Sequence, residues 1–202
     1  MPASLLAVSD HDDFDKEMHG ADWAAVYERQ AERADLVARF CDLLELEAGD
    51  HVLEIGCGPG HTSVQLAERV APGLVYAVDR QLDALAYLLT EAEGDTDRVR
   101  PVVGDAESLP VRFDEPTPTL AAFVLHHVDD PARAVESIAS SIPESSPLLV
   151  VEYDPDAAGE VGPPLDHRLA PAKCREWLSA AGFTVESEVD LGEEKYALLA
   201  RR

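Results

Sequence analysis

The sequence is poor in basic residues. Sixteen lysines and arginines, of which only three are lysines, stand against forty aspartates and glutamates, so the formal charge is −24. A chain without a basic stripe cannot neutralise many phosphates, which argues against a nucleic-acid substrate. The acids are spread along the whole chain among periodic apolar positions, which argues against a disordered acidic tail. Because salt near 1 M shortens the Debye length to about 3 Å, we interpret this charge as a halophilic adaptation to a salt-rich cytoplasm.

Cysteines and long apolar runs are also scarce. The three cysteines are widely spaced and form no CxxC motif, so neither a disulfide framework nor a zinc site is expected. No histidine spacing is typical of metal ligands, and we predict no metal site. No apolar run approaches the roughly 20 residues that a bilayer requires, and residues 1–10 lack the basic residue typical of a signal peptide. We therefore expect a soluble cytoplasmic protein without a membrane span.

Short apolar segments alternate with helical patterns along the chain. A helical pattern covers residues 21–46, where apolar residues recur at spacings of three and four. Strands are predicted at residues 51–55, 74–78, 99–103, 119–124, 147–152, 183–189 and 195–200, and further helices at 62–70, 83–93, 131–142 and 171–181. This alternation predicts an α/β fold in which helices cover both faces of a mostly parallel sheet.

The end of the chain departs from the parallel pattern. About five residues join the last two predicted strands, which is too short for a parallel crossover, so the final strand must run antiparallel. The predicted fold is thus a Rossmann-like, doubly wound, seven-stranded sheet with an antiparallel last strand. We expect residues 1–45 to form an N-terminal helical cap and residues 46–202 the ligand-binding domain, within one globular unit.

A glycine-rich turn follows the first predicted strand and carries the strongest local signal. Gly56, Gly58 and Gly60 allow positive φ and a close approach of a ligand to the backbone. A dinucleotide site needs Gly-x-Gly-x-x-Gly, and here the residue after Gly60 is His61, so the third glycine of that motif is missing. Glu54, two residues before the turn, suits a cationic ligand better than a pyrophosphate. S-adenosylmethionine carries a sulfonium and an ammonium group.

Two further acidic residues come directly after predicted strands. Asp79 can accept hydrogen bonds from both hydroxyls of a ribose, although dinucleotide sites use such a residue too. Asp105 can accept a hydrogen bond from an adenine amine, and the backbone N–H of Ala106 can reach a ring nitrogen. Acidic residues at three successive strand ends form a more specific pattern than a glycine turn alone.

The chain resembles the class I S-adenosylmethionine-dependent methyltransferases. It is similar in particular to the broad small-molecule group that includes the ubiquinone/menaquinone-biosynthesis C-methyltransferases. The matching segments are residues 52–60, 75–80, 104–110, 123–131 and 148–154. The resemblance implies that S-adenosylmethionine is the cofactor. It implies contacts from Glu54, Gly56, Gly58 and Gly60 to the methionine end, from Asp79 to the ribose, from Arg80 near the adenine, and from Asp105 and Ala106 to the adenine.

The methyl acceptor is less clearly encoded. His126 and His127 follow the fourth strand, where such enzymes place groups that face the acceptor, and His126 is our candidate general base. Trp23 and Tyr27 are candidates for a lid or for core packing, and His167 with Arg168 for substrate contacts.

We predict methyl transfer to an O, N or C nucleophile of a small molecule. Two alternatives stay open. A nucleotide-dependent oxidoreductase is opposed by the missing third glycine and by the lack of a second, substrate-binding domain. A non-catalytic module that only binds S-adenosylmethionine is the other.

Overall fold

The structure is a computed structural model, which describes residues 21–202. Residues 1–20, the first part of the predicted cap, lie outside the described residues. The strands are β1 (His51–Ile55), β2 (Leu74–Asp79), β3 (Val99–Val103), β4 (Thr119–Ala122), β5 (Pro147–Tyr153), β6 (Thr184–Gly192) and β7 (Lys195–Arg201). The helices are α1 (Trp23–Ala31), α2 (Ala34–Leu43), α3 (His61–Val70), α4 (Leu82–Thr90), α5 (Pro131–Ser141) and α6 (Pro171–Ala180), with 3₁₀ turns η1 (Thr96–Arg98), η2 (Leu125–His127) and η3 (Leu165–His167).

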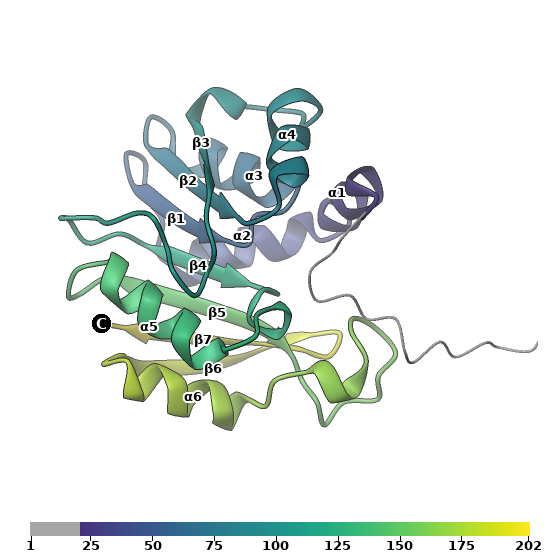
Figure 1. Cartoon of the computed structure of the whole chain (residues 1–202), viewed down its shortest axis with the longest axis vertical. Helices are drawn as coiled ribbons and strands as arrows, with labels where there is room; N and C mark the ends of the chain where they lie inside the picture. Colours follow the sequence, from purple (N-terminus) through teal and green to yellow (C-terminus); the bar gives the residue numbers. More distant parts are fainter. Residues whose placement is uncertain (1–20) are drawn as a thin grey trace, which may run out of the picture.

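The strands form one seven-stranded sheet in the order β3-β2-β1-β4-β5-β7-β6 (Figure 1). Neighbouring strands from β3 to β5 run parallel, and β7 is antiparallel to both β5 and β6. The predicted fold class, including the antiparallel last strand, is confirmed. Within residues 21–202, no helix combines the length and the apolarity that crossing a membrane demands.

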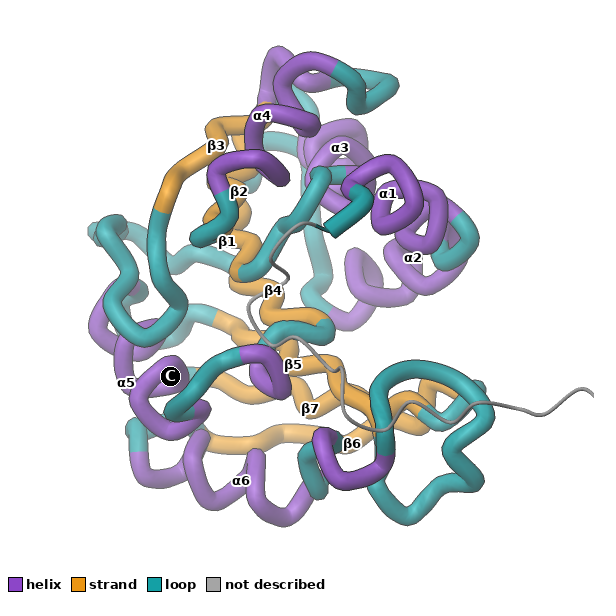
Figure 2. The backbone as a smooth tube through the Cα atoms, turned by 45° about the vertical axis from the view of Figure 1, so that its right-hand side comes forward, coloured by secondary structure: helices purple, strands orange, loops and turns teal. Residues whose placement is uncertain are grey.

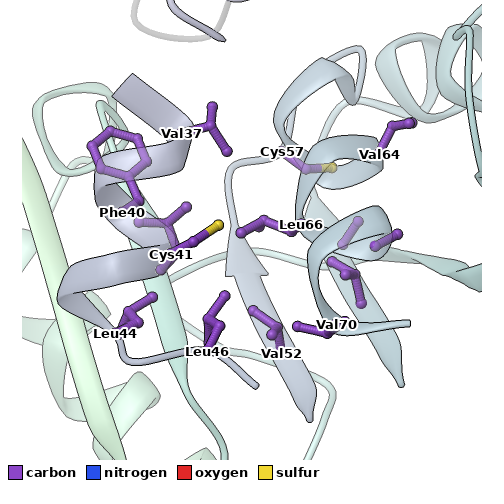
Figure 3. Close-up of a cluster of buried hydrophobic side chains, with 14 of the residues drawn as sticks. Val37, Phe40, Cys41, Leu44, Leu46, Val52, Cys57, Val64, Leu66 and Val70 are labelled. Carbon is purple, nitrogen blue, oxygen red and sulfur yellow. The ribbon is translucent and has the colours of Figure 1, made fainter. Parts of the chain in front are cut away.

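Alternate strand residues point to opposite faces of the sheet, and helices cover each face. Val52 of β1 joins a core built with α2 and α3, whereas the next residue, Leu53, joins a core built with α5 and α6. In Figure 3, the Cys41 side chain of α2 points toward Leu66 of α3. Burial of each such side chain contributes about 1.5–3 kcal/mol, so these two cores hold the strand ends in place.

The prediction of one helix over residues 21–46 is wrong, because the chain forms two helices with a turn between them at Glu32 and Arg33. The apolar positions that suggested one helix lie in α2, which buries Val37, Phe40 and Cys41. Helix α1 contains no buried residue. It lies beside α3 (Figure 2) and also contacts α4, while α2 packs on α3 and into the core.

The fourth strand ends at Ala122, two residues earlier than predicted. Phe123 adopts a left-handed backbone with φ of 57°, which no strand can continue. Its amide still donates to the carbonyl of Val151 on β5 at 2.8 Å. The chain therefore leaves the sheet abruptly at this residue and enters the η2 turn.

The contact between Gly60 and the Leu88 side chain of α4 leads to a prediction. A Cβ atom there would lie 2.1 Å from Leu88 Cδ1, and the backbone has φ of +91°. Gly182 has the same φ with open space around it. We expect Gly182→Ala to lower the free energy of unfolding by about 1–2 kcal/mol through backbone strain alone. Gly60→Ala should lose a further 1–3 kcal/mol or so through overpacking.

Urea denaturation of the two variants measures the difference. Equal losses for Gly60→Ala and Gly182→Ala would show that Leu88 makes room for the methyl group, contrary to the packing described above.

Candidate active site

A cavity of about 520 Å³ opens at the carboxyl ends of the central strands. It lies where neighbouring β1 and β4 lead to opposite sides of the sheet, the usual ligand position in open α/β folds. Its volume is in the range of small-ligand sites. Its wall includes residues of α1, the glycine turn, the ends of β2 and β3, the η2 turn and the loop after β5. Among residues 21–202, no cluster of three or more potential metal ligands occurs.

The three glycines of the turn have different surroundings. A Cβ atom on Gly56 would lie 2.4 Å from Val124 Cγ2, whereas one on Gly58 would meet only the Gln30 side-chain nitrogen, at 3.3 Å. Gly56 and Gly58 line the cavity, but Gly60 is not among its lining residues. Gly60 instead precedes α3 and permits contact with Leu88. The structure thus shows a packing contact for Gly60, and its contact with the cofactor stays a prediction.

Gln30 of α1 ties the N-terminal helices to this turn. Its side-chain nitrogen donates to the carbonyl of Cys57 at 3.2 Å, and its side-chain oxygen accepts from the amide of His61 at 3.0 Å. One amide side chain thus bridges the end of the turn and the first residue of α3. This contact holds α1 over one side of the cavity.

Glu54 is a buried carboxyl group on the cavity wall, with 4% of its surface exposed. The hydroxyl of Ser63 on α3 donates to it. Burial is the main cause that raises the pKa of Glu54. The Ser63 hydrogen bond opposes it, nearby Asp79 adds a smaller increase, and the resulting pKa is about 7. A buried carboxyl with such a pKa is stabilised in its charged form by any cation placed beside it.

Asp79 and Asp105 lie at neighbouring strand ends on the same cavity. The Asp79 carboxylate accepts from the amides of Gly58 and Gln81, both at 2.8 Å, and burial raises its pKa. Asp105 accepts from the amide of Glu107 at 2.9 Å and is exposed. Arg80 and Ala106 also line the cavity. The structure thus brings together every residue predicted at the cofactor except Gly60.

His126 lies on the cavity wall with 5% of its surface exposed. Its Nδ1 is 2.6 Å from Oε2 of Glu152, a wholly buried residue of β5. The other oxygen of Glu152 accepts from the amides of Leu125, at 2.8 Å, and of His126, at 3.3 Å. Glu152 was not predicted from the sequence. The available signal was one acidic residue inside an otherwise apolar strand, since a buried charge requires partners.

Of the remaining residues predicted to form a lid or contact the acceptor, only some line the cavity. Trp23 lines it, but Tyr27 instead packs between His61 and Tyr87, with ring centroids 5.0 and 5.6 Å away. His127 also lines the cavity.

Arg168 and His167 are not among the lining residues. The predicted substrate contact from Arg168 is wrong, because its guanidinium is buried and is hydrogen-bonded to the loop after β5. It donates to the carbonyls of Asp154, Val161 and Pro163 and pairs with Glu194 at 2.7 Å.

Comparisons with known proteins agree with this geometry. Residues 52–143 match the family described as "Methyltransferase domain". The "Uncharacterized methyltransferase YcgJ" of Bacillus subtilis is 28% identical over 109 residues, 54% of this chain and 43% of that protein. The protein-L-isoaspartate O-methyltransferase of Aeropyrum pernix is 34% identical over 133 residues, 60% of this chain and 50% of that protein. The matched part spans half the length of these curated relatives or less.

Solved structures share the fold along most of the chain. A SAM-dependent methyltransferase from Aquifex aeolicus has a TM-score of 0.77 at 20% identity, covering 87% of this chain and 96% of that one. Residues 52–143 thus match a methyltransferase domain, and the chain has the fold of the S-adenosylmethionine-dependent methyltransferases. The [4+2]-cyclase SpnF has the same fold, with a TM-score of 0.73 at 20% identity over 84% of this chain and 80% of its own. The fold of the methyltransferase domain therefore does not by itself define the reaction.

The cavity fits S-adenosylmethionine, the cofactor that the sequence predicts and that the methyltransferases of this fold use. The turn at Gly58 has no side chain toward the cavity, and the buried carboxyl of Glu54 lies next to it on the wall. Asp79 and Asp105 supply hydrogen-bond acceptors at the two adjacent strand ends. The donor and acceptor groups thus match a cationic amino-acid end and a nucleoside end.

The raised pKa of Glu54 predicts that the affinity for S-adenosylmethionine depends on pH. Because the pKa of Glu54 is raised to about 7, the folded protein keeps this carboxyl group protonated at pH values where the unfolded chain has already lost the proton. The free energy of unfolding therefore falls as the pH rises from the ordinary pKa of a glutamate to about 7. Cationic S-adenosylmethionine favours the ionised form. We expect its affinity to rise about tenfold from pH 6 to pH 8 by calorimetry, as the proton is lost.

Glu54→Gln is the control, since it keeps the shape of the side chain and removes the titration. Its affinity should be low and flat over the same range. A wild-type affinity that does not change with pH, or an unchanged slope in Glu54→Gln, would exclude Glu54 as the group responsible.

Proposed function

We propose that the protein transfers a methyl group from S-adenosylmethionine to an O, N or C nucleophile of a small molecule, with His126 as general base. One observation carries this proposal. The paired His126 lies on the same cavity as the three strand-end acidic residues Glu54, Asp79 and Asp105. A binding site for the cofactor and a group able to take a proton thus share one enclosed space.

The cofactor end of the proposal uses the residues on the β1 and β2 side. Glu54, Gly56 and Gly58 would hold the methionine end, while Asp79 would bind the ribose with Arg80 beside it. Asp105 and the amide of Ala106 would bind the adenine. When bound, S-adenosylmethionine supplies an electrophilic methyl group on its sulfonium. The N-terminal cap would be α1 and α2, which Gln30 ties to the glycine turn.

His126 would act on the acceptor. Its Nδ1 faces Glu152, so Nε2 is the nitrogen that would take the acceptor proton. The acceptor atom gains the methyl group and gives its proton to the imidazole, while the electrons of the broken C–S bond stay on sulfur. Glu152 positions the ring and stabilises the imidazolium that forms, and it does not touch the acceptor.

Relatives act on different acceptors. Similar proteins include protein-L-isoaspartate O-methyltransferases and a 23S rRNA (uracil-C5)-methyltransferase from Acidithiobacillus ferrooxidans. Here α1 and the loop after β5 enclose the cavity, and the chain as a whole is strongly acidic. Both features favour a metabolite-sized acceptor over RNA. The similarity to quinone-biosynthesis C-methyltransferases stays a prediction.

The proposal predicts a large loss of turnover without the base. His126→Ala should lower methyl transfer to the acceptor by roughly 10²-fold or more while S-adenosylhomocysteine affinity stays nearly constant. His51→Ala, at the opposite end of β1 on the surface, is the matched control. Labelled methyl transfer to a panel of phenols, quinols and amines measures the effect. Normal turnover of His126→Ala would show that this residue is only structural.

The same assay decides between acceptor classes. Label that enters tRNA, rRNA or protein but none of the small molecules would refute a small-molecule acceptor. No methyl transfer to any class, with S-adenosylmethionine bound, would favour a binding module or another reaction.

We also propose that the acidic surface adapts the protein to high salt. Carboxylates such as Asp35, Glu68 and Asp97 are exposed, and their mutual repulsion is screened only when salt is present. The melting temperature should therefore fall by at least about 3 °C from molar to millimolar KCl, which corresponds to roughly 1 kcal/mol for a chain of this size. A melting temperature that does not change with KCl would contradict this interpretation.

A further inference from the structure

Part of the cavity wall is formed by aromatic rings that are not among the predicted cofactor residues. Phe123 follows β4 and Tyr153 ends β5, and both line the cavity. Their ring centroids are 4.9 Å apart with the planes inclined by 38°. The ring of His126 lies 6.2 Å from that of Tyr153. The aromatic pair is therefore next to the proposed base.

The backbone at Phe123 is strained to place this ring. Its φ of 57° lies in the left-handed region, which is costly for a bulky side chain. Glycine or asparagine would occupy this position with less strain. The surrounding sheet contacts maintain this geometry, since the Phe123 amide is bonded to Val151. Strain that is kept at a cavity wall points to a functional use of the side chain.

Three cations surround the ring of Tyr153. Arg168 lies 5.5 Å, Lys195 5.8 Å and Arg33 6.0 Å from its centroid. Two of them have a carboxylate partner: Arg168 pairs with Glu194, and Lys195 with Glu193, each at 2.7 Å. Neither of these two lines the cavity. The third, Arg33, does line it.

Arg33 differs from its two neighbours in charge pairing. Its guanidinium carbon lies 5.1 Å from the Phe123 ring centroid, and the side chain is half-buried. No carboxylate of residues 21–202 lies within ion-pair distance of it. The nearby Glu193, whose pKa is lowered by Lys195 and to a smaller extent by Arg33, makes its ion pair with Lys195. In a chain with forty acids and sixteen bases, Arg33 thus places a positive charge on the cavity wall beside the aromatic pair.

We propose that this part of the cavity wall binds an aromatic acid that carries a hydroxyl group, and that this is the class of methyl acceptor. The inference rests on the proposed function. The aromatic ring of the acceptor packs on Phe123 and Tyr153, and its carboxylate pairs with the Arg33 guanidinium. The hydroxyl then lies toward His126, gives its proton to the imidazole and gains the methyl group, while the C–S bond electrons remain on sulfur.

The wall behind this aromatic pair is fixed rather than open. A Cβ atom on Gly162 would lie 2.4 Å from the Tyr153 ring, so the loop after β5 runs directly against that ring. The buried Arg168 holds the loop through the carbonyls of Asp154, Val161 and Pro163. The loop cannot move away without breaking these bonds, so this wall of the proposed subsite is fixed.

Calorimetry on protein saturated with S-adenosylhomocysteine, at one fixed KCl concentration, tests the proposal. The probes are 2-, 3- and 4-hydroxybenzoate, each compared with its neutral hydroxybenzamide. We expect at least one hydroxybenzoate to bind about tenfold or more tightly than its amide, since a charge-assisted pair contributes on that scale. Arg33→Gln should abolish this preference. Phe123→Asn, which suits the left-handed backbone, should weaken acid and amide alike.

Arg175→Gln is the charge-matched control, because Arg175 is exposed and pairs with Glu188 away from the cavity. It should bind all probes as the wild type does. S-adenosylhomocysteine binding by every variant verifies the fold. Equal affinities for acids and amides in the wild type, binding of none of them, or a preference that survives in Arg33→Gln would overturn the inference. If labelled methyl groups still pass to other small molecules in those cases, the proposed function stands without the aromatic-acid subsite.

Discussion

Three nitrogen atoms converge on the carboxyl group of Glu152, which has no exposed surface. Two are backbone amides of the η2 turn and the third is Nδ1 of His126. A buried carboxyl group is costly unless its oxygens are hydrogen-bonded, so Glu152 and the η2 turn require each other. Because Glu152 is part of β5, its contact with His126 fixes the position of the imidazole relative to the sheet. The cavity wall on the acceptor side depends on this contact.

The opposite wall of the cavity depends on the same kind of interaction, a carboxylate that accepts hydrogen bonds from backbone amides. Asp79 joins the glycine turn to the start of α4 through the amides of Gly58 and Gln81. Asp22 and Asp130 accept hydrogen bonds from backbone amides at the starts of α1 and α5. Some of the acidic residues are therefore structural. Many others are exposed and give the surface its negative charge, whereas Arg33 places a positive charge on the cavity wall.

Most of the fold could be predicted from the sequence because its signals are local. Glycine and proline bound the short apolar strands, and β1 and β3 have the predicted limits. The predicted cofactor residues, except Gly60, line one cavity because a parallel sheet brings its carboxyl ends to one edge. Contacts between distant segments were not readable. Glu152 meets His126 across 26 residues, and Leu88 alone gives Gly60 its packing role. From the sequence, Arg168 was a candidate for substrate contact, whereas in the structure it is buried against the loop after β5.

The central claim is that one cavity holds S-adenosylmethionine on the β1 and β2 side and an acceptor beside His126. A crystal structure of the full chain with S-adenosylhomocysteine tests it most directly. The account predicts the nucleoside between Asp79 and Asp105, the amino-acid end at Glu54 and Gly58, and the sulfur toward His126, with the hydrogen bond from His126 to Glu152 intact. Ligand density at Phe123 and Tyr153 instead, or outside this cavity, would contradict it.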